Sequence, residues 1–170
     1  MSRKITRAAL LLALMLLFQS LRLIIPVPPF ISMFVIGSAV NACLLLAVEI
    51  VGWQAALLLA VAAPVVAAAQ QFLPSPLLIL PVAAANLIYA GLYALLFRYR
   101  RWLAVLAAAG MKMLGLYGLS TLLLQWLQIP DKLALALKLM FSYPQLITGI
   151  LGGILCFIIG KKVLKREVTG

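Results

Sequence analysis

Long apolar runs, separated by short polar or proline-rich breaks, follow one another along the whole chain. Most runs contain about 20 residues, the length that an α-helix needs to cross the hydrocarbon core of a bilayer. They lack the alternation of apolar and polar residues that marks the strands of a membrane β-barrel. The pattern predicts an all-α integral membrane protein with a single domain, residues 1–170, and six transmembrane helices over residues 5–25, 30–50, 53–70, 77–97, 102–127 and 144–160.

The breaks between the runs indicate where helices stop. PVPPF, after the first run, is rich in proline, which cannot continue a helix. QQFLPSP separates the third run from the fourth, and RYRR separates the fourth from the fifth. The segment QIPDKLALALKLMFSYP is less apolar and carries Lys132 and Lys138. It predicts an interfacial turn or a short amphipathic helix before the last run.

Composition supports the membrane assignment. The chain is 66% hydrophobic and 10% charged, with a mean hydropathy of +1.21. A soluble domain of 170 residues has too small a core to hide that much apolar surface. The net charge of +11 would suggest nucleic acid binding in a soluble protein. Here the basic residues lie at helix ends, so we expect them to face lipid headgroups and expect no nucleic acid partner.

The basic residues also predict the orientation in the membrane. With the N-terminus in the cytoplasm, the outer loops hold only Arg22, Lys132 and Lys138. Positive charge accumulates on the cytoplasmic side of membrane proteins. We therefore expect both termini in the cytoplasm and a multi-pass location in a prokaryotic cell (inner) membrane. The inner segments would hold Arg3, Lys4, Arg7, Arg98, Arg100, Arg101, Lys161, Lys162, Lys165 and Arg166.

Groups for catalysis are scarce in this sequence. Histidine is absent, and the three acids, Glu49, Asp131 and Glu167, lie far apart in the chain. Cys43 and Cys156 fall inside apolar runs, as expected of small packing residues. The sequence has no paired carboxylates, no nucleophile–base arrangement and no phosphate-binding glycine loop. We predict a non-catalytic protein with no metal site and no cofactor, which cannot use ATP by itself.

Lys112 is the most unusual residue of the predicted membrane segments. It lies about ten residues inside the fifth helix, or roughly 15 Å deep at ~1.5 Å per residue. A charge at that depth costs at least ~2.5–3.5 kcal/mol, so it usually serves a function. Asn41 and Asn86 lie at a similar depth in other helices. They either form hydrogen bonds between helices or, with Lys112, bind a solute that is anionic or rich in carbonyl groups.

A second polar layer lies toward the predicted outer side. Arg22 ends the first helix, Gln145 begins the last one, and several further glutamines lie at the same level. Tyr117 and Ser120 follow Lys112 toward the outside. This layer is either an ordinary belt at the headgroup level or a wet vestibule that leads down to Lys112. The candidate substrate-binding residues are Lys112, Asn86, Asn41, Arg22, Tyr117, Ser120 and Gln145.

Two short stretches resemble a known family. The basic N-terminus precedes Ala9-x-x-x-Ala13, and FSYPQLITGILGG opens the last predicted helix. Together with the length, the six helices and the cytoplasmic termini, they resemble the substrate-binding S components of energy-coupling factor (ECF) transporters. In these bacterial and archaeal ABC importers, an S component captures a vitamin or other micronutrient from outside.

The resemblance implies partners and an S-component-like bundle. A transmembrane coupling (T) subunit would dock on Ala9 and Ala13, and two ATPase subunits would hydrolyse ATP. The predicted function is then high-affinity binding of a small, vitamin-like solute within the lipid bilayer. The alternative is a structural or assembly membrane protein in which Lys112 pairs with a carboxylate of a partner subunit.

Overall fold

The fold is entirely helical in the part of the chain that the computed structural model describes, residues 2–24, 28–127 and 130–168. No strand occurs in these ranges. The elements in chain order are α1 (Ser2–Ile24), α2 (Pro29–Leu46), the π-helix η1 (Ala47–Val51), α3 (Trp53–Ala69), the 3-10 helix η2 (Pro76–Leu78), α4 (Ile79–Leu96), α5 (Arg101–Trp126), α6 (Asp131–Met140) and α7 (Tyr143–Val168).

Five helical segments of the described chain are long and apolar enough to cross a membrane, which is compatible with a multi-pass membrane protein. The helix α3, predicted as a span over residues 53–70, is apolar but has only 17 residues. Its length, and not its composition, sets it apart from the five longer segments. The five segments are Arg3–Ile24, Ile31–Val51, Pro76–Leu96, Arg101–Trp126 and Asp131–Lys162.

The helix bounds differ from the predicted ranges mainly at two places. The second predicted helix, residues 30–50, is α-helical only to Leu46 and continues as the π-helix η1. This element ends at Gly52, whose φ of 126° favours glycine. The last helix extends to Val168, beyond the predicted end at residue 160. The segment predicted as an interfacial turn or short helix forms α6.

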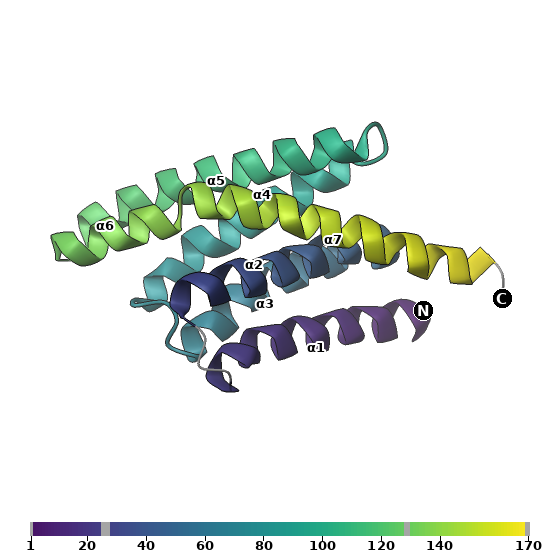
Figure 1. The fold of residues 1–170 in the computed structure, drawn as a ribbon, viewed down its shortest axis with the longest axis horizontal. Helices are drawn as coiled ribbons and strands as arrows, with labels where there is room; N and C mark the ends of the chain where they lie inside the picture. Colours follow the sequence, from purple (N-terminus) through teal and green to yellow (C-terminus); the bar gives the residue numbers. More distant parts are fainter. Residues whose placement is uncertain (1, 25–27, 128–129, 169–170) are drawn as a thin grey trace.

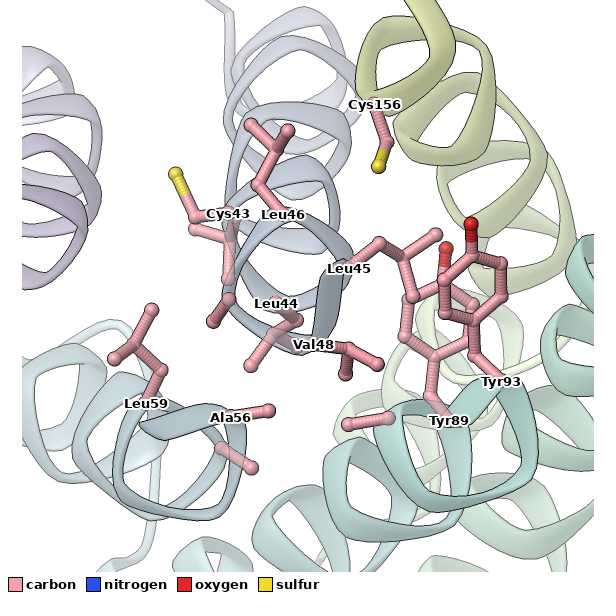
Figure 2. Packing of buried hydrophobic residues seen from close by; sticks show 14 of the residues in the cluster. Cys43, Leu44, Leu45, Leu46, Val48, Ala56, Leu59, Tyr89, Tyr93 and Cys156 are labelled. Atoms are coloured by element: carbon pink, nitrogen blue, oxygen red, sulfur yellow. The ribbon is translucent and has the colours of Figure 1, made fainter. Parts of the chain in front are cut away.

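The helix α2 lies at the centre of the core. In the most apolar 18 residues of its span, 72% are buried, compared with 11% for α1. It packs most extensively against α7 and also contacts α1, α3 and α4. A helix that is apolar on every side is expected to be surrounded by other helices. Figure 2 shows α2 with its neighbours Ala56 and Leu59 from α3, Tyr89 and Tyr93 from α4, and Cys156 from α7.

The close packing of α2 and α7 depends on Gly152. A Cβ atom at this position would lie 2.5 Å from Cβ of Asn41 and 3.0 Å from the backbone oxygen of Ser38. Real side chains do not approach so closely, so the absence of a side chain sets the distance between the two helices. This contact holds Asn41, one of the predicted site residues, in a fixed position between α2 and α7.

One end of the bundle is strongly basic. The start of α1, the connection between α4 and α5, and the later part of α7 lie together at this end (Figure 1). We call it the basic end. Its positively charged side chains include Arg3, Lys4, Arg7, Arg98, Arg100, Arg101, Lys161 and Lys162.

The carboxylate of Glu49 is engaged at the basic end. The Tyr93 hydroxyl donates a hydrogen bond of 2.6 Å to Oε1 of Glu49. Nε of Arg101 lies 3.8 Å from the same oxygen, and the Glu49 side chain is only 2% exposed. Glu49 follows Asn41 by eight residues, or roughly 12 Å along the helix at ~1.5 Å per residue. This acid therefore belongs to the basic end and does not pair with the lysine in the middle of the bundle.

We expect Gly152→Ala to destabilise the protein by about 1–3 kcal/mol, because the new methyl group overpacks the contact between α2 and α7. Thermal unfolding in detergent would measure the effect as a lower midpoint. Gly118→Ala is the matched control, since its Cβ atom would meet nothing within 4 Å. The assignment of the helix contact fails if both variants unfold at the wild-type temperature.

Candidate solute-binding pocket

A cavity of about 120 Å³ lies among α1, α2, α3, α4, α5 and α7 and is partly open. Arg22 lies two residues before the end of α1, Phe72 follows α3, and Phe141 precedes α7. These segment ends lie opposite the basic end (Figure 1). The lining residues are Gln19, Arg22, Met33, Ile36, Gly37, Val40, Asn41, Ala63, Pro64, Ala67, Phe72, Leu73, Val82, Asn86, Lys112, Leu116, Phe141, Gln145 and Thr148.

Lys112 lies buried in the wall of this pocket, near the middle of α5. Its Nζ donates a hydrogen bond of 2.5 Å to Oδ1 of Asn41. The same atom lies 5.1 Å from the centroid of the Tyr89 ring, within the range of a cation–π interaction. A lysine ammonium has three donors, so these contacts leave capacity for a ligand. No carboxylate occurs among the lining residues.

A short chain of hydrogen bonds orients Asn41. Its Nδ2 donates to Oγ1 of Thr148 over 3.4 Å, and the Thr148 hydroxyl donates to the backbone oxygen of Gln145 over 3.2 Å. The carbonyl of the Asn41 side chain is thereby turned toward Lys112. Asn41 on α2 is thus bonded to Lys112 on α5 and to Thr148 on α7. All three side chains are buried.

Arg22 is the second cation in the pocket. Its Nε donates to the backbone oxygen of Gln19 over 3.0 Å, and its guanidinium carbon lies 4.0 Å from the centroid of the Phe72 ring. Nη1 of Arg22 is buried and has no hydrogen-bond partner among the described residues. The adjacent Gln19 donates through Nε2 to the backbone oxygen of Ala63 over 2.9 Å. Its Oε1 is buried and also lacks a described partner.

Two more predicted residues line the pocket through amide groups. Nδ2 of Asn86 donates to the backbone oxygen of Ala60 over 3.3 Å. Nε2 of Gln145 donates to the backbone oxygen of Met140 over 3.2 Å. These bonds link α4 to α3 and α7 to the end of α6. Asn86 and Asn41 therefore each link two helices and also line the pocket. Hydrogen bonding between helices and solute binding, the two roles considered for them, are compatible.

The structure thus brings five of the predicted substrate-binding residues to one cavity: Lys112, Asn86, Asn41, Arg22 and Gln145. Tyr117 and Ser120 do not line it. The side chain of Tyr117 is 44% exposed on the outside of the bundle, because five residues turn a helix about 140° away from Lys112. Ser120 is buried, and its hydroxyl donates to the backbone oxygen of Tyr117 over 3.2 Å.

Of the lining residues absent from the predicted site, Thr148, Gln19 and Phe72 contact the predicted ones or lie closest to them in the sequence. Thr148 lies three residues after Gln145, and Gln19 three residues before Arg22, so each shares a helix face with a predicted residue. This spacing could have indicated both. No comparable signal exists for Phe72, because it lies in a connection whose path is set by tertiary packing.

The remaining predicted positions and groups lie away from the pocket. Ala9 and Ala13 are exposed on α1. Gln128, one of the glutamines of the predicted outer polar layer, falls outside the described residues. Within the described ranges, no group of three or more His, Cys, Asp or Glu side chains could hold a metal ion.

Comparisons of the chain with models of protein families, with curated proteins and with solved structures found no match.

We expect Asn41→Leu to destabilise the protein by about 1–3 kcal/mol, because it leaves the buried ammonium of Lys112 without its acceptor. The double variant Asn41→Leu with Lys112→Met should recover much of the loss, since both polar partners are then replaced by apolar groups. Thermal unfolding of the two single variants and the double variant would measure this coupling. Equal melting points for Asn41→Leu and the double variant would show that the hydrogen bond is not stabilising.

Proposed function

We propose that this protein is a membrane-embedded binding protein for a small solute that is anionic or rich in carbonyl groups. The observation that carries the proposal is the composition of the pocket wall. Two basic side chains, Lys112 and Arg22, line one cavity, and no carboxylate lines it with them. A buried cation without a carboxylate partner favours a negatively charged or electronegative ligand. The apolar remainder of the wall suits the carbon skeleton of such a solute.

The proposed orientation has six membrane passes, both termini in the cytoplasm and the pocket open to the outside. Eight basic side chains of the described residues gather at the basic end. The positive-inside rule assigns such an end to the cytoplasm of a prokaryotic inner membrane. The segment ends that line the pocket lie at the opposite end and would then face the outside. The helix α3, although short, would cross as the third pass.

Labelling of introduced cysteines would test this orientation. Lys132→Cys lies at the start of α6, and Tyr99→Cys lies in the connection between α4 and α5; both positions are exposed. A membrane-impermeant maleimide should label Lys132→Cys in intact cells and label Tyr99→Cys only after lysis. The unmodified chain is the control, because Cys43 and Cys156 are buried. The reverse labelling pattern would overturn the orientation.

The proposed physiological role is that of the S component of an ECF-type importer. The support is the sequence resemblance, together with Ala9 and Ala13 on an exposed face of α1 where a coupling subunit could dock. The absence of paired catalytic groups in the sequence agrees with a subunit that leaves ATP hydrolysis to partners. A structural role, in which Lys112 pairs with a partner subunit, is less supported, because Lys112 is only 4% exposed and binds Asn41 of its own chain.

Co-purification of partner subunits with the wild-type chain and with a variant that has larger side chains at Ala9 and Ala13 would test this role. We expect the wild-type chain to co-purify with a coupling subunit and two ATPase subunits. The double variant Ala9→Leu with Ala13→Leu should lose them, because larger side chains prevent close helix approach. Ala107→Leu, at an exposed position of α5, is the matched control and should retain them.

The same purified samples would separate docking from solute binding. In a thermal-shift screen of small anionic and neutral micronutrients, the docking variant should bind as the wild type does. Lys112→Ala should weaken binding at least tenfold through loss of one charge-assisted hydrogen bond. If no ATPase subunit co-purifies and no solute binds, the proposed role is wrong.

A further inference from the structure

We propose that Arg22, rather than Lys112, binds the anionic group of the solute, and that the solute is a monocarboxylate whose apolar body is about the size of one six-membered ring. This inference rests on the proposed solute-binding function. It assigns separate tasks to the two cations of the pocket. Lys112 then donates a hydrogen bond to the far end of the solute and provides no charge-specific anchor.

The contacts of the two cations differ. The ammonium of Lys112 already has a side-chain oxygen acceptor, Oδ1 of Asn41, and a ring face, that of Tyr89. Among the described residues, Arg22 donates one hydrogen bond, from Nε to the backbone oxygen of Gln19. Its Nη1 is buried without a partner among the described residues. A buried donor without an acceptor is costly, so the guanidinium gains more than the ammonium from an arriving anion.

The placement of Arg22 suits a carboxylate. The Phe72 ring covers the guanidinium at 4.0 Å, and a stacked guanidinium keeps its N–H groups at the edge. A carboxylate matches two such N–H groups in a planar, bidentate arrangement. The bond from Nε to the Gln19 backbone fixes the side chain, so little entropy is lost on binding. Arg22 also lies two residues before the end of α1, at the end of the bundle opposite the basic end.

The room between the two cations is small and apolar. Ile36, Val40 and Leu116 line the wall together with Met33, Val82 and other apolar side chains. The cavity measures about 120 Å³. An apolar cavity of about 150 Å³ in another protein accommodates benzene. The cavity of this protein is of similar size, so a single ring suits its enclosed part better than a fused or multi-ring body does.

Binding of benzoate, benzamide and inorganic phosphate to the full-length chain in lipid nanodiscs would test the assignment. Benzamide is the neutral counterpart of benzoate, and phosphate is an anion without an apolar body. Equilibrium dialysis should show that the wild type prefers benzoate to benzamide at least tenfold and binds phosphate far more weakly. Arg22→Gln should remove the preference, a loss of about tenfold to a hundredfold in benzoate affinity.

Three further variants make the result specific. Arg22→Lys should retain part of the preference, because it keeps the charge and loses the bidentate fork. Lys112→Met should leave the preference for benzoate over benzamide unchanged, because the two probes have the same ring at the end away from Arg22. Arg98→Gln, at an exposed position of the basic end, should bind both probes as the wild type does. If Arg22→Gln does not fold, Phe72→Leu serves in its place, with an expected several-fold loss for benzoate.

The outcomes separate this inference from the proposed function. If Lys112→Met abolishes the preference and Arg22→Gln preserves it, the assignment of Arg22 is wrong, but the pocket still binds a solute. If the wild type binds none of the three probes, or binds phosphate as well as benzoate, the ligand class is wrong. Co-purification with the ATPase subunits would then still judge the importer role on its own.

Discussion

The hydrogen bond between Lys112 and Asn41 is the interaction on which the middle of the bundle depends. A lysine near the centre of a membrane-spanning helix needs an acceptor, because neither lipid nor an apolar core offers one. Asn41 provides it, and Thr148 holds Asn41 in place. The close approach at Gly152 brings α2 and α7 near enough for this arrangement. The close packing at Gly152 and the hydrogen bonds of Asn41 therefore both hold α2 next to α7, and the bond to Lys112 adds α5.

The carboxylate of Glu49 lies away from the two cations of the pocket. The one carboxylate on the helix of Asn41, that of Glu49, is bound by Tyr93 and Arg101 at the basic end. The pocket at the other end keeps its two cations without an internal counter-charge. A cation that has no counter-charge in the free protein gains one when an anion binds beside it. Such a cation therefore favours the liganded state. The two pocket cations without a carboxylate beside them are the reason why we propose an anionic ligand.

The sequence predicts the helices well, because long apolar segments favour them, and Lys112 lies near the middle of α5 as its position in the predicted helix indicated. The sequence predicts poorly which side chains contact one another. Asn41 shares a depth with Lys112 in the sequence, but only packing decides which faces meet. Tyr117 illustrates the failure, since its depth is suitable and its helix face is turned outward. The π-helix after Leu46 and the stacking of Phe72 on Arg22 depend on contacts between distant segments, which local patterns do not encode.

The helix α1 has the fewest buried residues of the spans compared above, and it carries both Arg22 and the exposed face at Ala9 and Ala13. A solute held by Arg22 would tie this loosely packed helix to the remainder of the bundle. Because a helix is a stiff rod, restraint at one end limits its tilt at the other. Occupancy of the pocket and the shape offered to a docking partner would then be thermodynamically linked through a single element, without any rearrangement of the core.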